Sequence, residues 1–119
     1  KRGSSESFWV ITGTTKAHKI SNDIKLAAQS SATVVILMGM SKLAEITALF
    51  RASGKKDTPV AIIQDGTPSK ERIGVGTVDT IETVVQELKL TNPSIIVIGE
   101  VVKHREQLLN LQLEIAQNA

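Results

Sequence analysis

The chain has 119 residues, of which 41% are hydrophobic, so it can bury one core but is too short for two ordinary domains. It has no Cys, which excludes disulfides and thiolate metal sites and is compatible with a reducing cytosol. Its apolar runs are far shorter than the ~20 residues of a membrane span. We therefore expect a cytoplasmic protein that does not enter a membrane. The formal charge of +2 comes from scattered Lys and Arg with only 3% aromatic residues, a composition that argues against nucleic-acid binding.

Apolar runs alternate with helical patterns along the chain, at the spacing of βα units. The apolar runs predict strands at residues 7–12, 33–38, 59–64, 73–78 and 94–99. Together they predict a three-layer α/β domain with a five-stranded mixed sheet. We expect the strand at 73–78 to be the antiparallel one, because only a loop joins it to the strand before, and parallel neighbours need a crossover of a dozen or more residues.

The helices are predicted from apolar spacing and from residues that start or stop a helix. A short helix is expected at 23–30. Ser41 can cap a second helix that Gly54 is placed to end. Asp79 and Glu82 have the offset of a capping box before a third helix, whose apolar residues repeat at i, i+3, i+4 and i+7.

A terminal helix is predicted at residues 105–117, with apolar positions that wrap widely around it. Core packing is the more common explanation for such a surface, and docking against a second subunit is the alternative. We expect a homodimer.

Two predicted strands end in glycine turns. The strand at 33–38 stops at Met38-Gly39, and the strand at 59–64 stops at Asp65-Gly66. Ligands of α/β sheets bind outside the carboxyl ends of strands, where a glycine lets a ligand reach the backbone. Two such turns can hydrogen-bond a heterocycle such as adenine, with the Met38 thioether against the flat ring. The simpler alternatives are that Gly66 only makes a turn and that Met38 only fills the core.

Several short motifs are discounted. The run Gly13-Thr14-Thr15-Lys16 has the residues of a phosphate loop in the wrong order. Gly74-Val75-Gly76 lacks the third glycine of a dinucleotide fingerprint, and its bare face is expected to pack on another backbone. His18 and His104 have no carboxylates at ligand spacing, so no metal site is predicted. No nucleophile elbow is present, and no catalytic residue is assigned.

Four segments, in order, resemble the tetrapyrrole methylases. They are VVILMGM at 34–40, TPVAIIQDGTPSKER at 58–72, GVGTVDTI at 74–81 and SIIVIGEVV at 94–102. Within that family the chain is most similar to uroporphyrinogen-III C-methyltransferases, and RGSSESF at 2–8 resembles the stretch that follows their interdomain linker. The cofactor motifs of the family's N-terminal half are not found. The resemblance therefore implies that residues 1–119 are the C-terminal domain of a tetrapyrrole methylase.

The resemblance also implies a function. The intact enzymes move methyl groups from S-adenosyl-L-methionine to ring carbons of uroporphyrinogen III, which gives precorrin-2 for sirohaem and cobalamin biosynthesis and leaves S-adenosyl-L-homocysteine. They bind the cofactor in a cleft between two domains. Methyl transfer requires alignment by both walls of that cleft, so the isolated chain is expected to be inactive.

The resemblance also implies roles for individual residues, by their positions in the matching segments. Met38 and Gly66 match family positions that contact the adenosine, mainly through backbone atoms, and Thr67 follows them. Because the substrate carries many carboxylates, Arg2, Lys16 and the loop at 14–22 are expected to contact it. Two alternatives stay open: another tetrapyrrole methylase that acts on a later cobalamin precursor, and a stand-alone oligomerisation or nucleotide-binding module.

Overall fold

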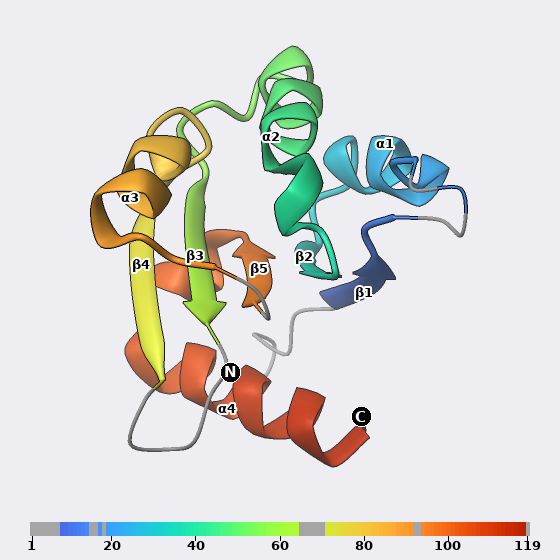
Figure 1. Cartoon of the computed structure of the whole chain (residues 1–119). Helices are drawn as coiled ribbons and strands as arrows, with labels where there is room; N and C mark the ends of the chain where they lie inside the picture. Colours follow the sequence, from blue (N-terminus) through green and yellow to red (C-terminus); the bar gives the residue numbers. More distant parts are fainter. Residues whose placement is uncertain (1–7, 15–16, 18, 65–70, 92–93, 119) are drawn as a thin grey trace.

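Five strands form one mixed sheet with helices on both faces (Figure 1). The computed structural model describes residues 8–14, 17, 19–64, 71–91 and 94–118. The strands are β1 (Phe8–Thr12), β2 (Thr33–Leu37), β3 (Pro59–Gln64), β4 (Arg72–Thr77) and β5 (Ser94–Ile98), and their order in the sheet is β1-β2-β5-β3-β4. The predicted fold class and the predicted strands are thus confirmed, with bounds that shift by a residue.

The direction of β5 differs from the prediction. β1 pairs with β2 in parallel, and β4 runs antiparallel to β3, as expected. However, β5 is also antiparallel to both of its neighbours, β2 and β3, so the expectation that β4 alone would be reversed is wrong. The reason lies in the connection, because a crossover helix returns the chain in the direction of the strand that it leaves. Helix α3 joins β4 to β5, and β5 keeps the reversed direction of β4.

The helices form the two outer layers. They are α1 (Asn22–Ala28), α2 (Leu43–Ala52), α3 (Ile81–Leu88) and α4 (Arg105–Asn118), with two short 3-10 turns, η2 (Met40–Lys42) and η4 (Glu100–Lys103). In Figure 1, α1, α2 and α3 lie at the top and α4 lies at the bottom, with the strands between them. Side chains of β2 alternate between the two layers: Val34 and Ile36 pack with α1, α2 and α3, whereas Val35 packs with α4.

The two glycines of β4 face α3. A Cβ on Gly74 would lie 2.9 Å from Val84 Cγ1 and 2.8 Å from Leu90 Cδ1, and one on Gly76 would lie 2.7 Å from Thr80 Oγ1. The bare face of this strand therefore packs mainly against side chains of α3 and its flanks, and it meets another backbone, as predicted, only at Gly76, where a Cβ would lie 3.6 Å from the Cα of Ile81. These glycines let the helix approach the edge strand closely.

Two of the predicted helix starts are wrong. Ser41 lies within η2, and α2 begins after Lys42 without a side-chain cap. Asp79 and Glu82 do not form a capping box, since the N-cap of α3 is Thr80, which makes no capping bond. Gly54 does follow the end of α2, with φ of +79°, and this prediction is confirmed.

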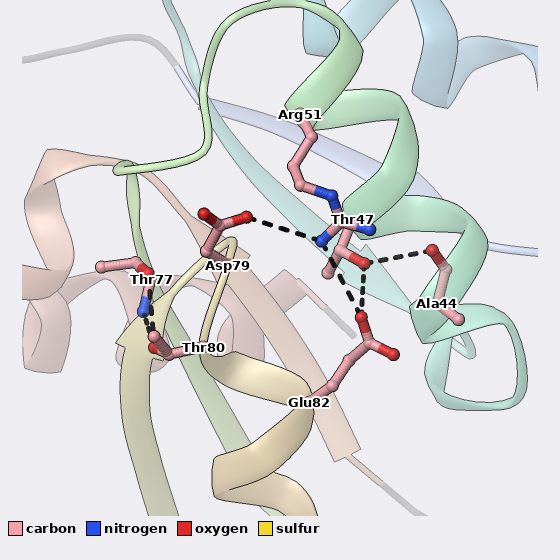
Figure 2. A network of polar contacts seen from close by, with 7 residues as sticks. All are labelled: Ala44, Thr47, Arg51, Thr77, Asp79, Thr80 and Glu82. Atoms are coloured by element: carbon pink, nitrogen blue, oxygen red, sulfur yellow. Dashed lines mark hydrogen bonds and ion pairs between the residues drawn. The ribbon is translucent and has the colours of Figure 1, made fainter.

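Glu82 instead joins α3 to α2 (Figure 2). The hydroxyl of Thr47, which is buried, donates to Glu82 Oε1 at 2.9 Å, and Arg51 Nη1 lies 4.0 Å from the same oxygen. Arg51 also pairs with Asp79 at 3.8 Å. The carboxylate of Glu82 thus finds its partner on the neighbouring helix α2, and not at the N-cap of its own helix.

Helix α4 is only partly buried. Leu108 and Leu111 pack on the sheet, so core packing explains that side, whereas Leu109 and Leu113 are 54% and 55% exposed. Among the described residues, no helix is long and apolar enough to cross a bilayer.

Candidate functional site

The carboxyl ends of β1, β2 and β3 lie at one edge of the sheet, because these three strands run in the same direction. The chain leaves this edge through Gly13 after β1, through Met38 after β2, and beyond Gln64 after β3. Such an edge is where α/β sheets bind ligands. We refer to Gly13, Met38, Gly39 and Gln64 as the carboxyl edge.

Met38 has an unusual backbone at this edge. Its φ is +58°, in the left-handed region that non-glycine residues adopt infrequently, and its side chain is 68% exposed. Non-glycine residues in this region cost about 1–2 kcal/mol and concentrate at ligand-binding sites. The turn directs the thioether out of the sheet, so Met38 does not fill the core, and that alternative is wrong.

Gly13 and Gly39 form the floor beside Met38. A Cβ on Gly13 would lie 2.6 Å from the Cα of Gly39, so the two backbones are in direct contact. The Gly13 amide donates to the carbonyl oxygen of Leu37 at 2.6 Å and extends the β1–β2 pairing past both strands. The hydroxyl of Thr14 donates to the carbonyl oxygen of Met38 at 3.4 Å. These bonds hold the Met38 turn in place from the β1 side.

The end of β3 is tied to the chain that precedes β5. The amide of Thr91 donates to Gln64 Oε1 at 2.8 Å, and the Ser94 hydroxyl donates to the carbonyl oxygen of Thr91. Gln64 also pairs with Ser94 in the sheet. The Oε1 of Gln64 is thus occupied by a hydrogen bond within the protein.

Of the residues predicted to bind a ligand, the structure places Met38 at the carboxyl edge. Gly66, Thr67, Arg2 and Lys16 lie outside the described residues, and their assigned roles stay predictions.

Sequence reasoning missed Gly13 as a part of this edge. The signal was available, because the run Val10-Ile11-Thr12-Gly13 repeats the pattern of an apolar strand that ends in a glycine. The loop that follows does not remain irregular throughout, since Thr14 bridges to Ile20 and the Ser21 amide donates to the carbonyl oxygen of Gly13 at 3.0 Å.

A small cavity lies at the opposite edge of the sheet, with a volume of about 150 Å³. Its lining includes Lys55, Phe50 and Glu100. The Lys55 ammonium donates to the carbonyl oxygen of Ser30 and lies 5.8 Å from the centre of the Phe50 ring. Burial lowers the pKa of Lys55 below its ordinary value of 10.5. The cavity is separate from the carboxyl edge.

Within the part of the chain that the structure describes, no group of three or more His, Asp or Glu side chains could hold a metal ion.

No family model matches the chain. The siroheme synthase of Nitrosomonas eutropha is 37% identical over 99 residues, which cover 82% of this chain and 21% of that protein. The siroheme synthase of Thiobacillus denitrificans is 35% identical over 108 residues, which cover 90% of this chain and 22% of that protein. The chain therefore spans about a fifth of the length of these relatives.

Solved structures share the fold. A uroporphyrin-III C-methyltransferase of Thermus thermophilus is 26% identical, with a TM-score of 0.64 over 91% of this chain and 44% of that one. The complex of the Thermus enzyme with S-adenyl homocysteine has a TM-score of 0.71 at 20% identity, over 87% of this chain and 46% of that one. The similarity to siroheme synthases over 90% of the chain and the shared fold support a tetrapyrrole methylase fragment. A cobalt precorrin-4 methyltransferase has the same fold, with a TM-score of 0.71 at 15% identity over 81% of this chain and 41% of that one.

Proposed function

We propose that this tetrapyrrole methylase chain is the C-terminal domain of an S-adenosylmethionine-dependent uroporphyrinogen-III C-methyltransferase, and that its carboxyl edge forms one wall of the cofactor cleft. One observation carries the proposal: Met38 is held in a left-handed backbone, with its thioether 68% exposed, at the end of β2. The sequence similarity to siroheme synthases and the solved Thermus complex support it.

The described residues fit the adenosine part of such a cofactor. The exposed Met38 side chain offers a polarisable apolar surface for a flat ring. Gly13 and Gly39 are buried side by side beneath it, where their lack of a Cβ lets the two strand ends pack closely on each other and on the core. When bound, the cofactor supplies an electrophilic methyl group. This chain contributes binding and orientation, because the described part of the carboxyl edge holds no acid, base or nucleophile positioned for chemistry.

The isolated chain should accordingly show no methyl transfer to uroporphyrinogen III, whereas the full-length protein should. The product precorrin-2 can be followed by absorbance after oxidation. Methyl transfer by the isolated chain would show that this domain does not need the other wall of the cleft for activity, and it would contradict the proposal. Turnover by the full-length protein on a later cobalamin precursor in place of uroporphyrinogen III would favour another tetrapyrrole methylase.

Calorimetric titration with S-adenosylhomocysteine tests the binding edge. In the full-length protein, Met38→Ala should weaken binding about tenfold, since it removes the exposed thioether surface and leaves a Cβ on the same backbone. Leu26→Ala is the matched control, because Leu26 is 57% exposed on α1 and is not one of the residues that form this edge. Equal affinities in the parent and in Met38→Ala would contradict the proposed site.

We also propose that the full-length protein is a homodimer. The edge strand β4 exposes Ile73 and Val75, at 42% and 55%, on the face of the sheet that α4 covers elsewhere. Mass measurement by light scattering tests this assembly, and a monomer at micromolar concentration would refute it. A dimer that binds no S-adenosylhomocysteine would instead favour the stand-alone oligomerisation module. The cytoplasmic location and the absence of nucleic-acid binding stay predictions.

A further inference from the structure

The chain has two methionines, two residues apart, in contrasting environments. Met38 is 68% exposed at the carboxyl edge. Met40 is half-buried and packs against the core cluster shared by the sheet with α1, α2 and α3. The buried Gly39 lies between them. Met38 is therefore more accessible to solvent reagents than Met40.

The local backbone explains this contrast. The left-handed residue Met38 ends the extended course of β2, and Met40 then opens the 3-10 turn that leads into α2. In an extended strand, residues two apart share a face, so Met38 and Met40 would lie in similar surroundings without this turn. The positive φ at Met38 thus accounts for the different exposure of the two residues.

Thioether exposure has a chemical consequence. A sulfur lone pair attacks one oxygen of hydrogen peroxide, the O–O bond breaks, and the second oxygen leaves with a proton as water. Sulfur is oxidised by two electrons to the sulfoxide, and the peroxide is reduced. The product is polar and chiral in place of a flexible apolar group, and reductases can restore the thioether.

We propose that Met38 is a peroxide-sensitive modification site, and that its oxidation to the sulfoxide weakens ligand binding at the carboxyl edge while Met40 is spared. The effect on binding rests on the proposed function, because it requires the adenosine to contact Met38. The selectivity between the two methionines rests only on their exposure. A polar S=O group against a flat apolar ring face must be desolvated without a partner, which opposes binding.

Limited treatment with hydrogen peroxide tests the selectivity. Both methionines fall in one tryptic peptide, residues 26–42, so fragment-ion mass spectra must assign the added oxygen to one sulfur. We expect Met38 to oxidise about tenfold faster than Met40 in the folded protein, and the two rates to converge in urea. Equal rates in the folded protein would overturn the inference.

The effect on binding is measured by titrating S-adenosylhomocysteine into the full-length protein before and after treatment. Oxidation should weaken binding about tenfold, and methionine sulfoxide reductase should restore it. Met38→Leu should be insensitive to peroxide, whereas the matched variant Met40→Leu should stay sensitive. Thermal melting of each sample shows whether the fold is kept.

The outcomes separate the two proposals. If the untreated protein binds no S-adenosylhomocysteine, the proposed function fails together with the effect on binding. If it binds, and if oxidation confined to Met38 leaves the affinity unchanged, the inference fails and the proposed function stands.

Discussion

Gly13 and Gly39 lie in direct backbone contact, so close that a Cβ on Gly13 would be 2.6 Å from the Cα of Gly39. Real Cβ atoms do not approach backbone atoms so closely, and a backbone neighbour cannot swing away as a side chain can. This contact joins the ends of β1 and β2 beside the Met38 turn. The packing of the carboxyl edge therefore depends on the absence of a side chain at position 13.

The first prediction concerns Gly13→Ala. It should lower the free energy of unfolding by about 2 kcal/mol, because the added methyl group forces the two strand ends apart. Gly54→Ala is a useful comparison, since a Cβ there meets nothing within 4 Å but the residue has φ of +79°. It should cost about 1 kcal/mol from backbone strain alone. Urea unfolding measures both values, and a Gly13→Ala protein as stable as Gly54→Ala would contradict the contact.

The second prediction concerns backbone strain at Met38 and Lys89, which have φ of +58° and +56°. Met38→Gly and Lys89→Gly should each stabilise the protein by about 0.5–1 kcal/mol, because glycine adopts this conformation without a clash. Met38→Ala should leave stability nearly unchanged, since it keeps the Cβ and removes only an exposed side chain. Thermal melting should show Met38→Gly above the parent by about 2–4 °C. A lower melting temperature for both glycine variants would show that these positions are not strained.

Strain of this kind limits what the sequence could predict. The apolar runs predicted all five strands, and the short link before β4 predicted its reversal, because both are local properties. The direction of β5 depends on the crossover through α3, and the partner of Glu82 lies 35 residues away on α2. Nothing local in Leu37-Met38-Gly39 places the positive φ on Met38 when a glycine follows directly. Met38 was predicted as a ligand residue from the strand end and the family resemblance, whereas its conformation required the structure.

The third prediction concerns the bond between Thr47 and Glu82, shown in Figure 2. Thr47→Val replaces a buried hydroxyl that donates to a carboxylate at 2.9 Å, and should cost about 1–2 kcal/mol. A double-mutant cycle with Glu82→Ala, which removes the acceptor, should give a coupling energy of about 1 kcal/mol. Asp79→Asn should cost less than about 0.5 kcal/mol, because the Arg51–Asp79 pair is exposed and 3.8 Å apart. Additive effects of Thr47→Val and Glu82→Ala would indicate that this bond contributes nothing to stability.

The fourth prediction concerns pH and Lys55, whose pKa burial lowers below 10.5. Between the lowered pKa of the folded protein and the ordinary value, the unfolded chain binds more protons than the folded one at this position. The contribution of Lys55 to the free energy of unfolding therefore rises as pH rises through this window, and it is constant below the lowered pKa. The neutral amine still has N–H groups for the Ser30 carbonyl, so the hydrogen bond can survive deprotonation.

Lys55→Met removes the titrating group and keeps an apolar chain beside Phe50. Urea unfolding from pH 7 toward pH 10.5 should show the stability of the parent rising relative to Lys55→Met, since only the parent is relieved of a desolvated charge. Lys56→Met removes the same charge from the exposed neighbouring residue and controls for net charge. A parent that loses stability relative to Lys55→Met across this range would mean that the bond to Ser30 and the Phe50 ring favour the charged form more strongly than burial opposes it.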